Sequence, residues 1–231
     1  MPEIKIKKHD FGPLGQVAFV DNLLPKPAFD ALADFARSQQ MLPISYTDPK
    51  GIWQHNEPFN PLQSKAVVWP EDDTYRPVLE TIPGIDLFPT GNPIDVALRT
   101  IRDLIIENAL LGEASPKWAG SVSTFNRFGP GDRVLWHRDG DEYVGAFSYY
   151  IHKEWDGNSG GQFLYKPGDP NADFEGGFIT PRPNRLVVIK APLLHAVSPV
   201  VEGAGSDRLA LTGFFVAPEA VSHILKLYAP A

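Results

Sequence analysis

The sequence contains no cysteine, which excludes disulfide bonds, thiolate metal sites and cysteine nucleophiles together. Positive charge is also scarce: the basic residues form no run beyond Lys5-Ile6-Lys7-Lys8, and the formal net charge is −7. Because nucleic-acid binding depends on clustered lysine and arginine, we expect no nucleic-acid partner.

Long apolar runs are absent as well, so we expect no segment that crosses a bilayer as a helix. The first residues, Met1 to Asp10, are charged and lack an apolar centre, and therefore do not resemble a signal peptide. We accordingly expect a soluble, cytoplasmic protein without a membrane partner.

Turn-forming residues, in contrast, are frequent: 23 prolines and 20 glycines are spread along the 231 residues. Turns at short intervals favour many short strands over long helices. Hydrophobic residues make up 43% of the chain, which is enough for a substantial core. No linker divides the two halves, so we expect a single domain over residues 1–231.

The first half, residues 1–117, is expected to form a layer of helices and loops. Apolar residues recur at helical spacing in Lys26–Gln39 and Ile94–Leu111, which predicts two helices. A strand is expected over Gly15–Val20. The polar and aromatic stretch Met41–Ser64 should be irregular, either as a lid over a pocket or as a mobile surface loop.

Residues 118–217 have a different character, because short apolar runs alternate there with turn signals. Each run is expected to be a strand; the runs are Ser121–Phe128, Val134–Trp136, Gly145–Ile151, Gln162–Tyr165, Gly177–Thr180, Leu186–Ile189, Ala196–Val201 and Leu209–Val216. Strands at this spacing are typical of a β-sandwich or jelly roll. A closing helix is expected over Pro218–Tyr228. The predicted fold is mainly β, with the N-terminal helices packed as an α layer on one sheet.

Two histidines and one aspartate are placed where they could share a metal ion. His137 and Asp139 lie at a strand end, two positions apart, so both side chains point to the same side. His195 begins another predicted strand of the same β-rich half. Two imidazoles and one carboxylate suit non-haem Fe(II) and leave open positions on the ion. His152, also at a strand end, is the main competing histidine.

A histidine followed two residues later by an acid is common by chance, so Arg208 matters as a second observation. Strand alternation puts Arg208, Ala210 and Thr212 on one face. An arginine that points into a barrel is costly unless an anion pairs with it, and a bound carboxylate would do so bidentately. The alternative is a surface arginine at a strand start. If Arg208 is not the anchor, Arg185 and Lys190 are the next candidates.

Six segments of the second half match one pattern in order. They are Asn126-Arg127-Phe128-Gly129-Pro130-Gly131 with His137-Arg138-Asp139, Tyr149-Tyr150-Ile151-His152-Lys153-Glu154-Trp155, Ser159-Gly160-Gly161-Gln162-Phe163, the stretch Pro181 to Ile189, His195-Ala196-Val197-Ser198-Pro199-Val200, and Arg208. Together they resemble the 2-oxoglutarate and Fe(II)-dependent oxygenases, in the prolyl-hydroxylase-like branch, over residues 121–216. Six segments in the right order are far more specific than a metal triad alone.

The resemblance implies a double-stranded β-helix, which is a cupin-like jelly roll. It implies three iron ligands, namely His137, Asp139 and His195. Arg208 would bind the distal carboxylate of 2-oxoglutarate, Tyr150 would contact the same carboxylate, and Thr212 would line that pocket. The implied cofactors are Fe(II), 2-oxoglutarate as co-substrate and O2, with ascorbate as a candidate stimulant.

The chain departs from the family pattern at several places. Phe128 replaces a tyrosine, so that any hydroxyl contact made there is lost, and His152 stands where asparagine is common. A few extra residues around Gly203–Ser206 lengthen the loop before Arg208, which a loop accommodates at little cost. Residues 1–117, which usually shape the substrate pocket in this family, lie outside the resemblance.

By this resemblance the chain is expected to hydroxylate an unactivated C–H bond and to release succinate and CO2. Desaturation, epoxidation and ring formation are related outcomes. A small-molecule substrate, such as an amino acid or a biosynthetic intermediate, is the leading expectation because the chain is compact and acidic. The alternatives are a prolyl-type hydroxylase of proteins or peptides, a non-catalytic cupin-like binding module and, with least support, a structural zinc site.

Overall fold

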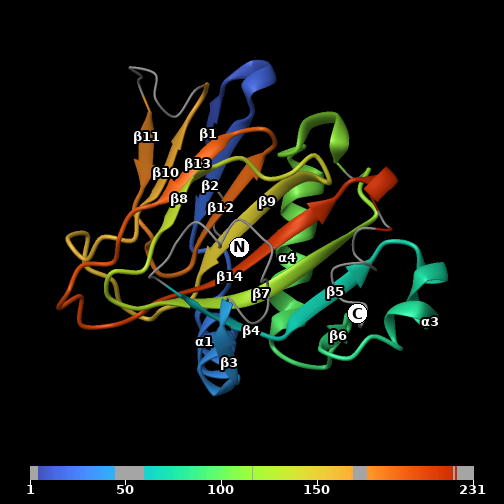
Figure 1. The fold of residues 1–231 in the computed structure, drawn as a ribbon, viewed down its shortest axis with the longest axis horizontal. Coiled ribbons are helices and arrows are strands. Elements are labelled where there is room, and N and C mark those ends of the chain that lie inside the picture. Colours follow the sequence, from blue (N-terminus) through green and yellow to red (C-terminus); the bar gives the residue numbers. More distant parts are fainter. Residues whose placement is uncertain (1–4, 45–59, 116, 169–175, 221, 223–231) are drawn as a thin grey trace.

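Two β-sheets face each other in the computed structural model, and helices cover the outer face of the larger sheet (Figure 1). The structure describes residues 5–44, 60–115, 117–168, 176–220 and 222. From β7 onward the chain passes repeatedly from one sheet to the other, which is how a jelly roll is wound. The predicted mainly β jelly roll is therefore confirmed.

The larger sheet has the strand order β1-β2-β12-β9-β14-β7-β4-β3, with β5 paired to β7 and β6 paired to β5. Its strands are β1 (Ile6–Asp10), β2 (Gln16–Asp21), β3 (Met41–Pro43), β4 (Leu62–Ser64), β5 (Ala66–Pro70), β6 (Ile85–Leu87), β7 (Gly120–Phe128), β9 (Tyr143–Tyr150), β12 (Arg185–Lys190) and β14 (Arg208–Val216). The smaller sheet has the order β11-β10-β13-β8. Its strands are β8 (Val134–His137), β10 (Phe163–Lys166), β11 (Gly177–Ile179) and β13 (Leu194–Val197).

Two amphipathic helices, α1 (Lys26–Ser38) and α4 (Ile94–Glu107), pack on the outer face of the larger sheet. Their apolar stripes share one buried cluster with the outward side chains of β9 and β14, including Phe29, Leu32, Ile101, Ile105, Tyr149, Leu209 and Leu211. This arrangement confirms the predicted helical layer on one sheet. The shorter helices are α3 (Arg76–Leu79) and the 3₁₀ turns Gly12–Leu14, Asp73–Tyr75, Gly112–Ala114 and Pro218–Ala220.

The N-terminal half contains more strands than the sequence predicted. One strand was expected there, over Gly15–Val20, and the described residues of this half form six, β1 to β6. The prediction that Met41–Ser64 is irregular was wrong at both ends, because Met41–Pro43 pairs with Leu62–Ser64 as β3 and β4. Strands of three residues are too short to show an alternating pattern. The possible lid falls mostly on residues 45–59, which lie outside the described residues.

In the second half every predicted strand is present, and only the ends differ. The largest shift is in β13, which spans Leu194–Val197 where Ala196–Val201 was predicted. The helix predicted to reach Leu111 ends at Glu107, because Ala109 has a left-handed backbone with φ of 46°. Of the closing helix predicted for residues 218–228, the first three residues form a 3₁₀ turn, and nearly all the others lie outside the described residues.

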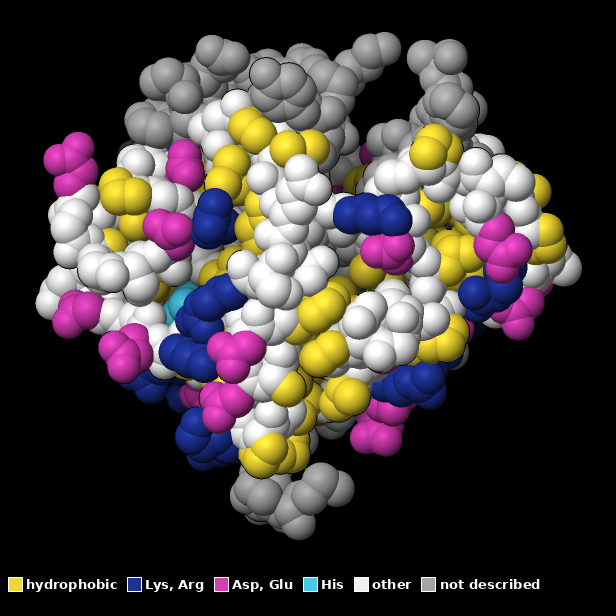
Figure 2. Space-filling model, turned by 90° about the horizontal axis from the view of Figure 1, so that it is seen from below, with side chains coloured by type: hydrophobic (Ala, Val, Ile, Leu, Met, Phe, Trp, Pro, Cys, Tyr) yellow, Lys and Arg dark blue, Asp and Glu magenta, His cyan; other side chains and the backbone are white. Residues whose placement is uncertain are grey.

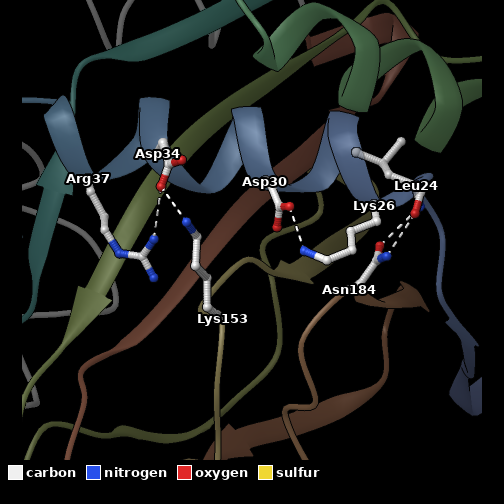
Figure 3. Close-up of polar contacts among 7 residues, drawn as sticks. All are labelled: Leu24, Lys26, Asp30, Asp34, Arg37, Lys153 and Asn184. Carbon is white, nitrogen blue, oxygen red and sulfur yellow. Dashed lines mark hydrogen bonds and ion pairs between the residues drawn. The ribbon is translucent and has the colours of Figure 1, made fainter.

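Polar contacts hold α1 and the segment before it against the jelly roll (Figure 3). Asp34 of α1 accepts hydrogen bonds from Arg37 and from Lys153, which follows β9. The Asn184 side chain donates to the Leu24 carbonyl at 2.8 Å and accepts from the Leu24 amide at 3.0 Å. These contacts fix the helical layer relative to the loops that begin and end the core strands.

An ion pair between a buried arginine and a partly exposed aspartate joins the N-terminal strand β2 to the jelly roll. Arg185 donates from Nε and Nη2 to the two carboxylate oxygens of Asp21, at 2.6 and 2.8 Å. The Arg185 side chain is only 6% exposed, whereas that of Asp21 is 38% exposed. This two-pronged contact lies where β2 and β12 pair, and it adds a charge-assisted link to the backbone ladder.

Charged side chains of both signs are mixed on the surface seen from below (Figure 2). Lysine and arginine lie beside aspartate and glutamate there, without an extended area of positive charge, in agreement with the low basic content of the sequence. Among the described residues, no helix is both long and apolar enough to span a bilayer.

Replacing Asp21 with asparagine should lower the free energy of unfolding by about 1–2 kcal/mol, because the buried Arg185 guanidinium then loses its carboxylate. Water reaches Asp21, so the loss is smaller than for a fully enclosed pair. Urea denaturation at pH 7 measures the loss. The matched control is Asp103→Asn, which alters an exposed carboxylate 3.8 Å from Arg102 and should unfold almost as the wild type does.

The same pair gives the stability a pH dependence in the acid range. Hydrogen bonds from Arg185 lower the pKa of Asp21 from its ordinary value of 3.8. The contribution should therefore be complete above that ordinary value and should be lost as the pH falls through the lower folded-state pKa. Equal urea midpoints for wild type and Asp21→Asn at pH 7 would contradict this account.

Candidate metal centre

Three predicted ligands come together between the sheets. His137 ends β8, His195 lies directly opposite it on β13, and Asp139 follows β8 by two residues. The Oδ1 atom of Asp139 is 3.7 Å from His137 Nε2 and 3.8 Å from His195 Nε2. Their ligand atoms all lie within 4.8 Å of one another, and no second group of three such residues occurs in the described part of the chain. The pairing of β8 with β13 and the two-residue spacing of His137 and Asp139 thus bring the three side chains together.

Backbone carbonyls fix which nitrogen of each imidazole faces that point. His137 Nδ1 lies 2.8 Å from the Leu135 carbonyl oxygen, and His195 Nδ1 lies 3.0 Å from that of Leu193. A carbonyl oxygen can only accept a hydrogen bond, so each Nδ1 must be the donor. Each Nε2 is then left with a lone pair directed toward Asp139, which is the form of histidine that binds a metal.

Burial keeps both histidines of this cluster neutral. Removal from water lowers the pKa of His137 to about 4, and the neighbouring His195 lowers it further. Burial likewise lowers the pKa of His195 to about 4 and raises that of Asp139 to about 6. Two neutral imidazoles and a carboxylate without a cationic partner among them fit a divalent ion such as Fe(II), and the lack of a fourth protein ligand leaves positions open.

Arg208 is the first residue of β14 and is buried at 1% exposure. Its Nε–H donates to the Gly161 carbonyl at 3.0 Å, and its guanidinium carbon lies 4.9 Å from the ring centres of both Phe128 and Tyr150. No carboxylate of the described residues pairs with it, and burial lowers its pKa. The predicted inward-facing arginine is therefore present, and an anionic ligand would supply the missing partner.

Gly161 makes room for the arginine. A Cβ atom at this position would lie 2.8 Å from Arg208 Cδ and 3.1 Å from the Trp155 ring, and the backbone φ is +64°. In the structure, the Arg208 side chain packs directly against Gly161.

The two other predicted pocket residues also face the inside. Tyr150 is fully buried, its hydroxyl makes no hydrogen bond of ordinary geometry with the described residues, and burial raises its pKa. It lies directly opposite Ala210 on β14, on the same face as Arg208. Thr212 lies on that face too, and its hydroxyl accepts a hydrogen bond from Asn126 at 2.5 Å.

The competing residues have other partners. His152 is 2% exposed, its Nε2 contacts the Pro181 carbonyl at 2.6 Å, and its ring lies against those of Tyr150 and Trp155. It is not part of the metal group. Arg185, the alternative anchor, is engaged by a carboxylate. The sequence analysis missed Phe163, whose ring stacks on His195 at 5.5 Å, because a single aromatic residue carries no signal of what it contacts.

Comparison with known proteins agrees with this geometry. Residues 123–216 match a family model described as the 2OG-Fe(II) oxygenase superfamily. A prolyl-4-hydroxylase from Pseudomonas putida has a similar structure, with a TM-score of 0.62 and 21% identity over 87% of this chain and 92% of that one. No curated protein is significantly similar in sequence.

Two further solved structures have the same fold. One is an oxidoreductase of the 2OG-Fe(II) oxygenase family from Burkholderia pseudomallei, with a TM-score of 0.56 and 12% identity over 87% of this chain and 85% of that one. The other is a prolyl hydroxylase from Trichoplax adhaerens in complex with a hypoxia inducible factor oxygen degradation domain peptide fragment. It has a TM-score of 0.57 and 14% identity over 90% of this chain and 86% of that one.

The purified protein should bind one Mn(II) or Fe(II) ion per chain. Asp139→Ala should weaken this binding at least about 100-fold, because it removes the only anionic ligand of the group. Anaerobic calorimetric titration of each metal measures the effect. The matched control is His152→Asn, which alters a buried histidine outside the group and should bind metal as the wild type does. Loss of metal binding in the control but not in Asp139→Ala would contradict the assignment of the three ligands.

Proposed function

With the chain identified as a 2OG-Fe(II) oxygenase by its match over residues 123–216, we propose that His137, Asp139 and His195 bind the iron. Arg208 binds the distal carboxylate of 2-oxoglutarate. The enzyme then couples hydroxylation of a substrate C–H bond to the conversion of 2-oxoglutarate and O2 into succinate and CO2. The observation that carries this proposal is a buried arginine, without a carboxylate partner among the described residues, in the same jelly roll as a cluster of two histidines and one aspartate.

The side chains have separate tasks in this reaction. The Nε2 lone pairs and the Asp139 carboxylate hold the ion on one side, so that its other positions stay available. Arg208 orients the co-substrate, and the buried Tyr150 hydroxyl donates a second hydrogen bond to the same carboxylate. Thr212 lines the pocket between them. Bound iron, with 2-oxoglutarate and O2, supplies the oxidising power, while the two packed sheets exclude water.

We propose a small molecule, such as an amino acid or a biosynthetic intermediate, as the substrate. The whole chain, residues 1–231, then forms one oxygenase domain around a core of residues 118–217. The contacts of α1, α4 and β2 with the jelly roll support this arrangement. A prolyl-type hydroxylase of peptides is the second candidate, favoured by the names of two proteins with similar folds.

Incubation with Fe(II), 2-oxoglutarate, ascorbate and O2 should yield succinate, and a panel of metabolites and peptides should reveal the product that gains one oxygen atom. Asp139→Ala and His195→Ala should each reduce succinate formation to the background of metal-free protein, since the metal is no longer held. Mass spectrometry measures both products. Unchanged turnover in either variant would refute the ligand assignment.

Arg208→Ala should raise the KM for 2-oxoglutarate by about 10- to 100-fold, because a desolvated charge-assisted contact is lost. Steady-state succinate formation at varied 2-oxoglutarate measures this change. The matched control is Arg182→Ala, which removes an exposed arginine and should leave that KM unchanged. Equal KM values for wild type and Arg208→Ala would place the anchor elsewhere.

A further inference from the structure

His152 is a buried histidine that belongs neither to the metal group nor to the residues that would touch 2-oxoglutarate. It is 2% exposed and lies two residues beyond Tyr150, just past the end of β9. Burial lowers the pKa of His152 to about 4, so the ring is uncharged at neutral pH. A buried polar ring outside the metal group needs a structural or functional explanation.

The two nitrogens of the His152 ring have different surroundings. Nε2 lies 2.6 Å from the Pro181 carbonyl oxygen, which can only accept a hydrogen bond, so Nε2 carries the proton. Nδ1 makes no hydrogen bond of ordinary geometry with the described residues. A buried nitrogen without a partner is unfavourable, so an apolar side chain would fill this space at lower cost. What histidine adds is a donor on the edge of a flat ring.

The flat ring lies against two aromatic side chains. Its centre is 6.0 Å from that of Tyr150, with 28° between the ring planes, and 4.9 Å from that of Trp155, with 38°. Both separations lie within the range over which aromatic rings attract each other. Trp155 is itself held, because its Nε1–H donates to the Gly160 carbonyl at 3.3 Å. The His152 ring thus connects Tyr150 to a tryptophan that is attached to the backbone.

The main chain around Tyr150 is fixed by other contacts. The Tyr150 carbonyl accepts from the Asn184 amide at 2.9 Å, and the Ile151 amide donates to the Leu209 carbonyl at 2.9 Å. With the main chain held, the direction of the Tyr150 hydroxyl depends on the rotation of its side chain. In the described part of the chain this buried hydroxyl makes no hydrogen bond of ordinary geometry that would orient it. Contacts of the ring therefore determine where it points.

The Nε2 donor of His152 has a separate, structural task. Pro181 is a buried residue of the loop before β12, and the donor satisfies its carbonyl oxygen. Loss of the donor alone should lower the stability of the fold, whereas loss of the ring should change the support of Tyr150. Substitutions that keep one of these features and remove the other can separate the two effects.

We propose that His152 is a positioning residue for the co-substrate anchor, because its ring holds the Tyr150 side chain in the orientation in which the hydroxyl donates to the distal carboxylate of 2-oxoglutarate. Arg208 supplies the charge, and its guanidinium carbon lies 4.9 Å from the centre of the Tyr150 ring. The affinity for 2-oxoglutarate then depends on a side chain that touches neither the iron nor the co-substrate. This inference rests on the proposed oxygenase function.

Calorimetric titration of the Mn(II)-loaded protein with 2-oxoglutarate tests this role without turnover. His152→Leu removes the ring and should raise the Kd for 2-oxoglutarate about five- to tenfold, as for the loss of one hydrogen bond, while the Kd for Mn(II) stays unchanged. His152→Phe keeps a flat ring without the donor. It should bind 2-oxoglutarate as the wild type does, although its thermal midpoint should fall because the Pro181 carbonyl loses its donor.

A double-mutant cycle shows whether the effect acts through Tyr150. Tyr150→Phe removes the hydroxyl, so in that background His152→Leu should have no further effect on the Kd for 2-oxoglutarate. The matched control is Tyr149→Phe, which removes a buried hydroxyl that donates to Asn184 on the opposite face of the same strand. This control should leave the Kd for 2-oxoglutarate unchanged.

The outcomes separate this inference from the proposed function. An unchanged Kd for 2-oxoglutarate in His152→Leu overturns the inference, and so does an equal loss of affinity in His152→Phe. A matching loss of Mn(II) affinity, or additive effects in the cycle, also contradicts it, because the ring would then act on the site as a whole. The proposed function fails by a different observation, namely that the wild-type protein neither binds 2-oxoglutarate nor forms succinate with any compound tested.

Discussion

A guanidinium group enclosed between two sheets, without a carboxylate among the described residues to neutralise it, is the constraint on which the site depends. Burying such a charge is costly, and Arg208 is held by a carbonyl oxygen and two aromatic rings that offset only part of this cost. It begins β14, which pairs with β7 on one side and β9 on the other. The inner face of three strands therefore surrounds a buried positive charge.

In the metal centre, local hydrogen bonds orient both histidine rings before any ion binds. Each histidine donates from Nδ1 to the carbonyl two residues earlier, so that strand geometry alone aims both Nε2 atoms at Asp139. The pairing of β8 with β13 then sets the distance between the rings. Neutral imidazoles, kept so by burial, avoid the repulsion that two charged rings would impose on a cation.

The sequence predicted those features that a regular period reveals. His137 and Asp139 were found because side chains two apart share a strand face, and Arg208 because alternation turned it inward. Strands β3, β4 and β6 were missed because three residues contain too little pattern. Gln63 and Asn126 were missed as a pair for another reason: their contact depends on β4 joining the sheet beside β7, and no local signal encodes that pairing. Tertiary placement, unlike periodicity, cannot be deduced from neighbours along the chain.

Gly161 shows how a missing side chain can define a binding property. Its open space is occupied by the stem of Arg208, so any larger residue there would push the guanidinium away without altering a single charge. Gly161 is thus a position at which one added methyl group would displace Arg208 while every charge of the site stays the same.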